Sequence, residues 1–227
     1  MDYYFISYGL TLISLIITLL AQCFVSSSYN KYSKIKNKRC ITGYTAARYI
    51  LDKNGLEEVK ILETSGHLTD HYDPKNKVIK LSSEVYYNDS IGAVSVACHE
   101  CGHAIQDKEN YKFMRIRASL VPFVNFSSYA GYIAIVLGIL FSSFNLIWLG
   151  IIAEVLILLF QVITLPVEID ASKKALRELD YAHFLDSNEL KQGKIMLTSA
   201  ALTYVASVAT TLIQILRLIL IFGRRED

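Results

Sequence analysis

The stretch FISYGLTLISLIITLLAQCFV, residues 5–25, contains no charged side chain. A helix rises about 1.5 Å per residue, so a segment of this length crosses the hydrocarbon core of a bilayer, which is about 30 Å thick. No basic segment precedes it and no small-residue cleavage site is evident after it. We therefore expect an uncleaved membrane anchor rather than a secretory signal.

Three further apolar stretches are long enough to span a bilayer, and they cover residues 120–141, 146–165 and 203–222. Two polar stretches, residues 26–119 and 166–202, separate the four apolar segments. The sequence therefore predicts an α-helical membrane protein with four transmembrane helices and a small α+β domain built from the two polar stretches.

The charged residues indicate which partners to expect and how the protein is oriented in the membrane. The formal net charge is only +2, and 52% of the residues are hydrophobic, so nucleic-acid binding is not expected. All but three of the 23 Lys and Arg residues lie in the two polar stretches. Because Lys and Arg are retained on the cytoplasmic side, we expect the polar domain in the cytoplasm and both termini outside. Arg224 and Arg225 conflict with an outside C-terminus, and a last segment that spans incompletely is the alternative.

The longer polar stretch contains VACHECGHAIQ, residues 96–106. Four residues make slightly more than one helical turn, so His99 and His103 share a face and can bind one metal ion. Glu100 is turned by about 100° from His99, which suits a general base that holds a water better than it suits a ligand. The spacing predicts a zinc site. Gly102 is unfavourable inside a helix, and its presence indicates the close approach of another element.

The four cysteines are too few and too scattered for a disulfide framework, and we expect free thiols. Cys98 and Cys101 flank the two histidines, but on a helix they face away from the histidine side. We therefore do not expect either thiol to bind the metal.

Short elements are predicted between the first span and the histidine motif. The patterns indicate an amphipathic helix over residues 42–54 that ends at Gly55, a capping residue within residues 88–90, and strands over residues 58–63, 67–73 and 78–81. The last two strands should form a hairpin. The strand over residues 78–81 is also a candidate to pair with an extended substrate, provided that it forms an edge of the sheet.

A catalytic zinc ion needs a third protein ligand and leaves one position for water. Glu168 follows the third predicted span, where the chain should return to the histidines. Asp170 is the alternative ligand. Two residues turn a helix by about 200°, so only one of these carboxylates can face the metal.

Five stretches of the chain resemble the YugP-like neutral zinc metallopeptidases, a family of bacterial membrane proteins. The stretches are NKRCITGYTAARYILDKNGL (residues 37–56), LTDHYDP (68–74), HECGHAIQ (99–106), PVEIDASKKAL (166–176) and AALTYVA (200–206). The layout is also similar to that of HtpX-type and CAAX-prenyl membrane proteases, in which a spanning hairpin separates H-E-x-x-H from a later glutamate ligand.

The resemblance implies a zincin-like domain with a gluzincin-type site, in which His99, His103 and Glu168 bind one Zn²⁺ and Glu100 is the base. It implies a zinc-dependent endopeptidase in the bacterial cell membrane, surrounded by lipid and acting on a peptide or protein substrate. The alternative is a membrane scaffold or adaptor that keeps the zinc site and cleaves nothing, although a structural site has no use for Glu100.

The more distant relatives commonly carry E-x-x-A-D, in which the final Asp supports a histidine ligand. In this sequence Ser172 occupies that position, so Asp70 or Asp170 becomes the candidate for this support. A donor for the oxyanion of the reaction is also needed, and three residues are candidates: His183, Tyr204 and His71.

Two charges fall inside predicted spans, Glu154 in the third and Arg217 in the fourth. An unpaired charge at such a depth costs at least about 2.5–3.5 kcal/mol. Their depths differ by only about 5 Å on the helical rise. We therefore predict that the third and fourth spans pack together with these two side chains in contact.

Overall fold

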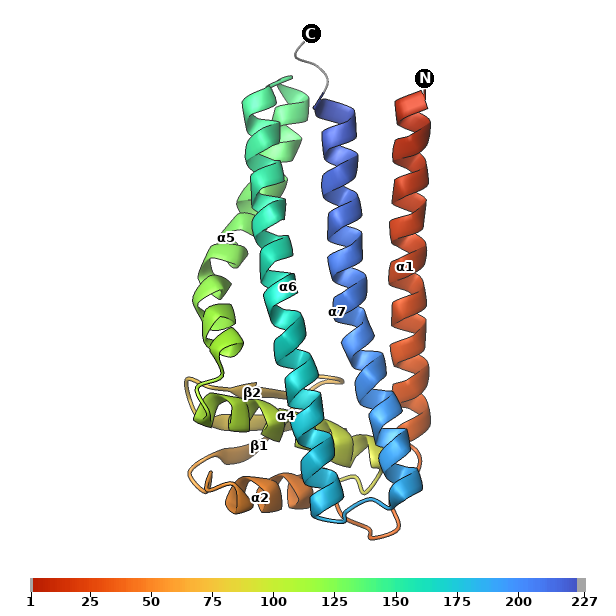
Figure 1. Ribbon diagram of the computed structural model, residues 1–227, viewed down its shortest axis with the longest axis vertical. Helices are drawn as coiled ribbons and strands as arrows, with labels where there is room; N and C mark the ends of the chain where they lie inside the picture. The colour runs from red at the N-terminus through yellow and green to blue at the C-terminus, as the bar shows by residue number, and fades with distance from the viewer. Residues whose placement is uncertain (1, 224–227) are drawn as a thin grey trace. The chain divides into compact units, whose positions relative to one another are not determined.

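A computed structural model describes residues 2–223, which are mostly helical (Figure 1). Arg224 and Arg225, on which part of the orientation argument rests, lie outside the described residues. The helices are α1 (Asp2–Tyr32), α2 (Gly43–Lys53), α3 (Ser83–Tyr86), α4 (Ile91–Lys108), α5 (Lys112–Leu140), α6 (Phe144–Tyr181) and α7 (Ser187–Phe222), and the strands are β1 (Lys60–Thr64), β2 (His71–Asp73) and β3 (Val78–Ser82).

Four of these helices, α1, α5, α6 and α7, are long and apolar enough to cross a membrane, in agreement with the predicted number of spans. Two of them continue furthest beyond their apolar parts. Helix α6 runs through Pro166 as far as Tyr181, and α7 begins at Ser187. Most of the second polar stretch is therefore an extension of these two helices rather than a separate element.

The chain divides into two compact units. The first consists of the described parts of Met1–Gln22, Arg115–Pro166 and Leu202–Asp227, and the second consists of Cys23–Met114 and Val167–Ala201. Helices α1, α5, α6 and α7 contribute residues to both units. The second unit contains the sheet and the two histidines of the motif.

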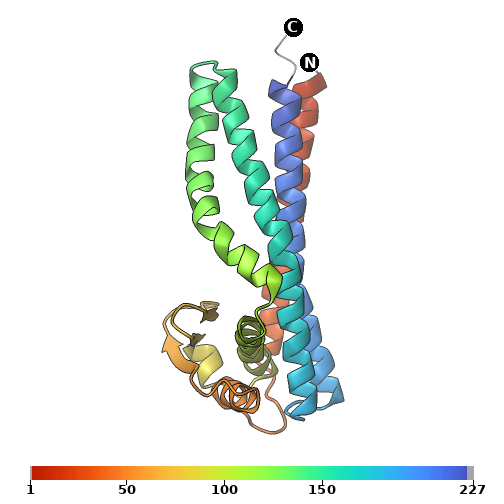
Figure 2. The same cartoon turned by 60° about the vertical axis from the view of Figure 1, so that its left-hand side comes forward.

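In the first unit, α5 and α6 form a hairpin (Figure 2) that is closely packed where glycines meet side chains. A Cβ atom added to Gly138 would lie 2.6 Å from the Ile147 side chain. Helices α6 and α7 also pack together, through a buried cluster that includes Ile151 and Leu218. This contact between the third and fourth spans was predicted from the sequence.

Among the residues that the structure describes, Arg217 and Glu154 are not in contact, so the prediction of a contact between them is wrong. Arg217 instead donates a hydrogen bond from Nη1 to Oγ1 of Thr11 on α1, at 2.8 Å. The polar partner of Arg217 is therefore a threonine hydroxyl, and not the carboxylate that the sequence argument had proposed.

The sheet of the second unit has the strand order β1-β3-β2. Strands β2 and β3 are antiparallel and form the predicted hairpin, whereas β1 and β3 are parallel. Because β3 has a partner on each side, the prediction that residues 78–81 form an edge is wrong. The edges are β1 and β2, and the nearly complete burial of β3 is typical of a central strand.

Side-chain caps start the two helices that pack on this sheet. Thr42 accepts a hydrogen bond from the backbone N–H of Thr45 at the start of α2, and Ser90 accepts one from Ala93 at the start of α4. Gly55, with φ +62°, follows the end of α2, where a left-handed residue is favoured. These local predictions are confirmed. The helices bury a common core with β3 and α6, and its fully buried side chains include Ile50, Leu51, Ile79, Leu81, Ile91, Val94 and Leu179.

Small residues let α4 approach the neighbouring helices of the second unit. A Cβ atom added to Gly92 would lie 2.9 Å from the backbone of Ser33, and one added to Gly193 of α7 would lie 2.6 Å from Oγ of Ser95. At Gly102 the added atom would lie only 2.5 Å from the carbonyl oxygen of Ala171 on α6. The close approach that Gly102 indicated in the sequence is therefore confirmed, and its partner is backbone that cannot rotate away.

We expect Gly102→Ala to destabilise the second unit by about 1–3 kcal/mol, because the methyl group forces α4 and α6 apart. Gly9→Ala is the matched control, since a Cβ atom at Gly9 meets nothing within 4 Å. Unfolding of both variants in detergent, measured by circular dichroism, gives the comparison. Equal unfolding midpoints for Gly102→Ala and wild type would contradict the role assigned to this contact.

Candidate metal centre

Two helices of the second unit bring together two imidazoles and one carboxylate. His99 and His103 project from α4, and Glu168 projects from α6. Oε2 of Glu168 lies 3.3 Å from Nε2 of His99 and 3.6 Å from Nε2 of His103. The three possible ligand atoms all lie within 4.8 Å of one another. Two imidazole nitrogens and a carboxylate oxygen are a donor set that catalytic zinc sites use, so these residues fit the ion that the sequence predicts.

The converging groups are shielded from solvent. Glu168 is 5% exposed, His103 is 8% exposed and Glu100 is 7% exposed. Burial alone would lower the pKa of His103, but its contact with Glu168 and the negative charges of Glu100 and Glu168 outweigh burial and raise that pKa. The surroundings of His103 therefore favour a positive charge, which suits a bound cation.

Asp170, the alternative to Glu168 as third ligand, points elsewhere. Its Oδ2 atom accepts a hydrogen bond from Nε2 of Gln106 at 2.9 Å and lies 3.7 Å from Nζ of Lys174. The rotation of about 200° between positions 168 and 170 of a helix accounts for this difference. Of the two carboxylates, the structure brings Glu168 to the histidines.

The outer nitrogen of each histidine contacts a neutral side chain. Oγ of Ser172 lies 3.2 Å from Nδ1 of His99, and Oε1 of Gln106 lies 3.0 Å from Nδ1 of His103. Ser172, the residue at which the sequence departs from E-x-x-A-D, thus contacts His99 directly. Sequence reasoning missed both partners, although helical spacing could have found them: Gln106 is three residues after His103, and Ser172 is four after Glu168.

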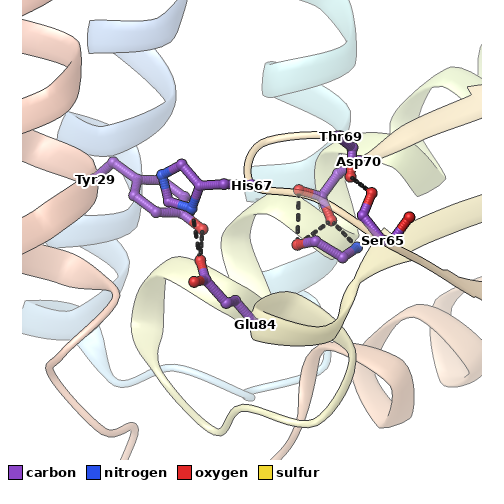
Figure 3. A network of polar contacts seen from close by, with 7 residues as sticks. Tyr29, Ser65, His67, Thr69, Asp70 and Glu84 are labelled. Atoms are coloured by element: carbon purple, nitrogen blue, oxygen red, sulfur yellow. Dashed lines mark hydrogen bonds and ion pairs between the residues drawn. The ribbon is translucent and has the colours of Figure 1, made fainter.

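Asp70 does not support a histidine ligand in the way proposed from the sequence. Its Oδ1 atom accepts hydrogen bonds from the backbone N–H of Ser82 at 2.7 Å and from the Ser82 hydroxyl at 3.1 Å. It lies on the loop between β1 and β2, near Tyr29, His67 and Glu84 (Figure 3). Burial raises the pKa of Asp70, while these hydrogen bonds partly offset the effect. Asp70 therefore fixes the loop and the start of α3. Asp170, the other candidate for this support, contacts Gln106, which in turn contacts His103.

The three candidate oxyanion donors lie in different parts of the structure. His183 is exposed beyond the end of α6, and the helix between Glu168 and Tyr181 is about 20 Å long, so the structure does not bring His183 to the histidines of the motif. His71 lies on β2 with Nδ1 2.7 Å from the carbonyl oxygen of Thr69, and Tyr204 belongs to the first unit. For these two residues the role stays a prediction.

The cysteines are free, as predicted. Cys98 and Cys101 are fully buried in the core on the side of α4 away from the histidines, and Sγ of Cys101 contacts the carbonyl oxygen of Ala47 at 3.6 Å. Burial raises the pKa of both thiols. Because a metal binds the thiolate, neither cysteine suits a ligand role.

The apolar helices and the convergence of two histidines with a glutamate define the class: a membrane protein with a candidate metal centre. The chain belongs to the family described as "Putative neutral zinc metallopeptidase", whose model matches residues 7–223. It is 44% identical over 220 residues to "Putative membrane protease YugP" of Bacillus subtilis (strain 168), which covers 96% of this chain and 98% of that relative. No solved structure matches the chain.

We expect the purified wild type to hold about one zinc ion per chain and Glu168→Ala to lose it, because two histidines alone do not make a catalytic zinc site. Asp170→Ala is the matched control, and it should keep most of the metal. Elemental analysis with a circular dichroism spectrum of each variant makes the comparison. A folded Glu168→Ala protein with full zinc occupancy would instead favour Asp170 as the ligand.

Proposed function

We propose that this protein is a zinc-dependent endopeptidase of the membrane. The observation that carries the proposal is the convergence of His99 and His103 with Glu168, while Glu100 extends from the same turn of α4. Three protein ligands leave one position for water and substrate, as in catalytic rather than structural zinc sites. The family description and the name of the Bacillus relative point to the same chemistry.

The zinc ion, when bound, supplies Lewis acidity that acidifies a water and polarises the carbonyl of the scissile bond. The chain supplies the proton transfers. Glu100 is buried and close enough for its charge to affect the pKa of His103. From this position its carboxylate takes a proton from the attacking water and passes it to the leaving amine. His71 and Tyr204 remain the proposed donors to the oxyanion.

The edge strand β2 replaces the central β3 as the proposed binding strand for an extended substrate. The hydroxyl of Tyr72 on β2 donates a hydrogen bond to Oδ2 of Asp107 at 2.8 Å, one helical turn after His103. This contact fixes β2 against the helix that carries the histidines. Backbone groups on the outer edge of β2 can then pair with a peptide.

The orientation argument from Lys and Arg places the second unit in the cytoplasm of a bacterial cell. The proposed substrate is then a peptide or protein segment that reaches the cytoplasmic side of the membrane, and lipid surrounds the apolar helices.

We expect Glu100→Gln to bind zinc like the wild type and to lose hydrolysis by roughly 10²-fold or more, since an amide cannot accept the proton of water. Zinc content and peptides released from membranes that contain either protein measure the two properties separately. Wild-type cleavage by Glu100→Gln would refute the mechanism. If the zinc-loaded wild type released no more peptide than Glu100→Gln, the scaffold or adaptor alternative would gain.

The orientation is tested with an introduced cysteine, Lys36→Cys, in a background with Cys23→Ser and Cys40→Ser. The Lys36 side chain is 76% exposed, so a thiol there is accessible. We expect an impermeant maleimide to label it only after the cells are opened. Ser142→Cys, in the hairpin between α5 and α6, is the control and should be labelled in intact cells. Labelling of Lys36→Cys in intact cells would overturn the cytoplasmic assignment.

A further inference from the structure

Gln106 is a fully buried polar side chain at the back of the metal centre. Its Nε2 atom donates to the carbonyl oxygen of Val167 at 2.8 Å and to Oδ2 of Asp170 at 2.9 Å. Its Oε1 atom lies 3.0 Å from Nδ1 of His103. Both donor hydrogens and the acceptor of the amide are therefore used, as expected for an amide that is removed from water.

The partners of Gln106 allow only one orientation of its amide. A backbone carbonyl can only accept hydrogen bonds, so the NH₂ group must face Val167, and from there it also donates to Asp170. The amide oxygen then faces His103. Rotating the amide by 180° would bring oxygen against the Val167 carbonyl and would leave buried groups unpaired, which costs about 1–3 kcal/mol per group.

This orientation determines where the imidazole of His103 carries a proton. An amide oxygen can only accept, so Nδ1 of His103 must carry the hydrogen. The opposite nitrogen, Nε2, is the one that lies 3.6 Å from Oε2 of Glu168. A metal ligand needs a free lone pair, and fixing hydrogen on Nδ1 reserves Nε2 for that purpose.

The same amide also holds the segment that carries the third ligand. Val167 directly precedes Glu168, and Asp170 follows it by two residues. Gln106 lies four residues after Gly102, on the side of α4 where the Ala171 backbone of α6 is closest. One side chain thus connects the second ligand to the helical turn that bears the third.

We propose that Gln106 is a positioning residue that fixes the tautomer of His103 and the placement of Glu168, and thereby sets the zinc affinity of the centre. The inference rests on the zinc site of the proposed function, and it does not require that the site cleave peptides. A side chain that merely bridged α4 and α6 would affect folding stability and leave the zinc affinity of the folded protein unchanged.

Three variants separate these roles. Gln106→Met has a similar volume but neither accepts from His103 nor donates to α6. Gln106→Glu keeps an acceptor for His103 but loses both donors and lies beside the Asp170 carboxylate. The double variant Gln106→Glu/Asp170→Asn exchanges amide and carboxylate with the total charge unchanged. Position 170 then donates to position 106, although the Val167 carbonyl still lacks its donor. Gln192→Met, on α7 of the same unit, is the matched control.

The measurement is the dissociation constant for Zn²⁺ in detergent, obtained by competition with a chelator, together with the absorption spectrum of the Co²⁺-loaded protein. We expect Gln106→Met to bind Zn²⁺ about 10–100-fold more weakly than wild type and to show an altered Co²⁺ spectrum. The double variant should bind Zn²⁺ more tightly than Gln106→Glu, because it restores the hydrogen bond between positions 106 and 170. Gln192→Met should match the wild type. Circular dichroism establishes that each variant is folded.

Equal zinc affinities for wild type and folded Gln106→Met would overturn the proposal, as would a folded double variant that binds no better than Gln106→Glu. If Gln106→Met does not fold, the order of affinity between Gln106→Glu and the double variant decides, and the proposal fails when the exchange at position 170 gives no recovery. A wild type that binds zinc and hydrolyses nothing would refute the peptidase function and leave this inference standing. A wild type that binds no zinc would refute both.

Discussion

The contact between α4 and α6 at Gly102 and Ala171 is the constraint on which the candidate metal centre depends. A side chain larger than hydrogen at position 102 would meet the Ala171 carbonyl at 2.5 Å. This approach brings Glu168 within 3.3 Å of His99, and it brings Gln106 within hydrogen-bonding distance of the α6 backbone. Glycine inside a helix costs about 1 kcal/mol relative to alanine. At position 102 this cost allows the two helices to approach closely enough to bring together residues that neither helix carries alone.

Features set by neighbouring residues could be predicted from the sequence, whereas several features set by distant pairings could not. Thr42 and Ser90 begin helices because their own side chains cap the next turn, and such signals are local. Strand β3 was recognised, but its position in the sheet depends on β1, which pairs with it from the other side. Arg217 was expected to need a polar partner, and only the arrangement of the spans decides between Glu154 and Thr11.

The same distinction between local and distant contacts applies to the candidate site. The spacing of His99 and His103 predicts their shared face, because a single helix fixes it. Glu168 came from the order of the segments and from family resemblance, with Asp170 left open, because its approach to α4 is a contact between residues distant in the sequence. The contact of Gln106 with His103 joins residues three apart on α4, so helical spacing can indicate it. The contact of Ser172 with His99 instead depends on the relative rotation of α4 and α6, which the sequence pattern does not contain.

The neutrality of Ser172 and Gln106 has an electrostatic consequence for a buried centre. With Zn²⁺ bound, Glu168 as ligand and Glu100 ionised as base, the formal charges cancel. A carboxylate in place of Ser172 would contact His99 and would add one negative charge beside the centre. The carboxylate that is present behind the site, Asp170, has Lys174 at 3.7 Å, and Lys174 in turn pairs with Glu109 at 2.6 Å. A hydroxyl and an amide can orient the histidines without adding charge, so the departure from E-x-x-A-D is compatible with a working zinc site in which Glu100 stays free to accept a proton.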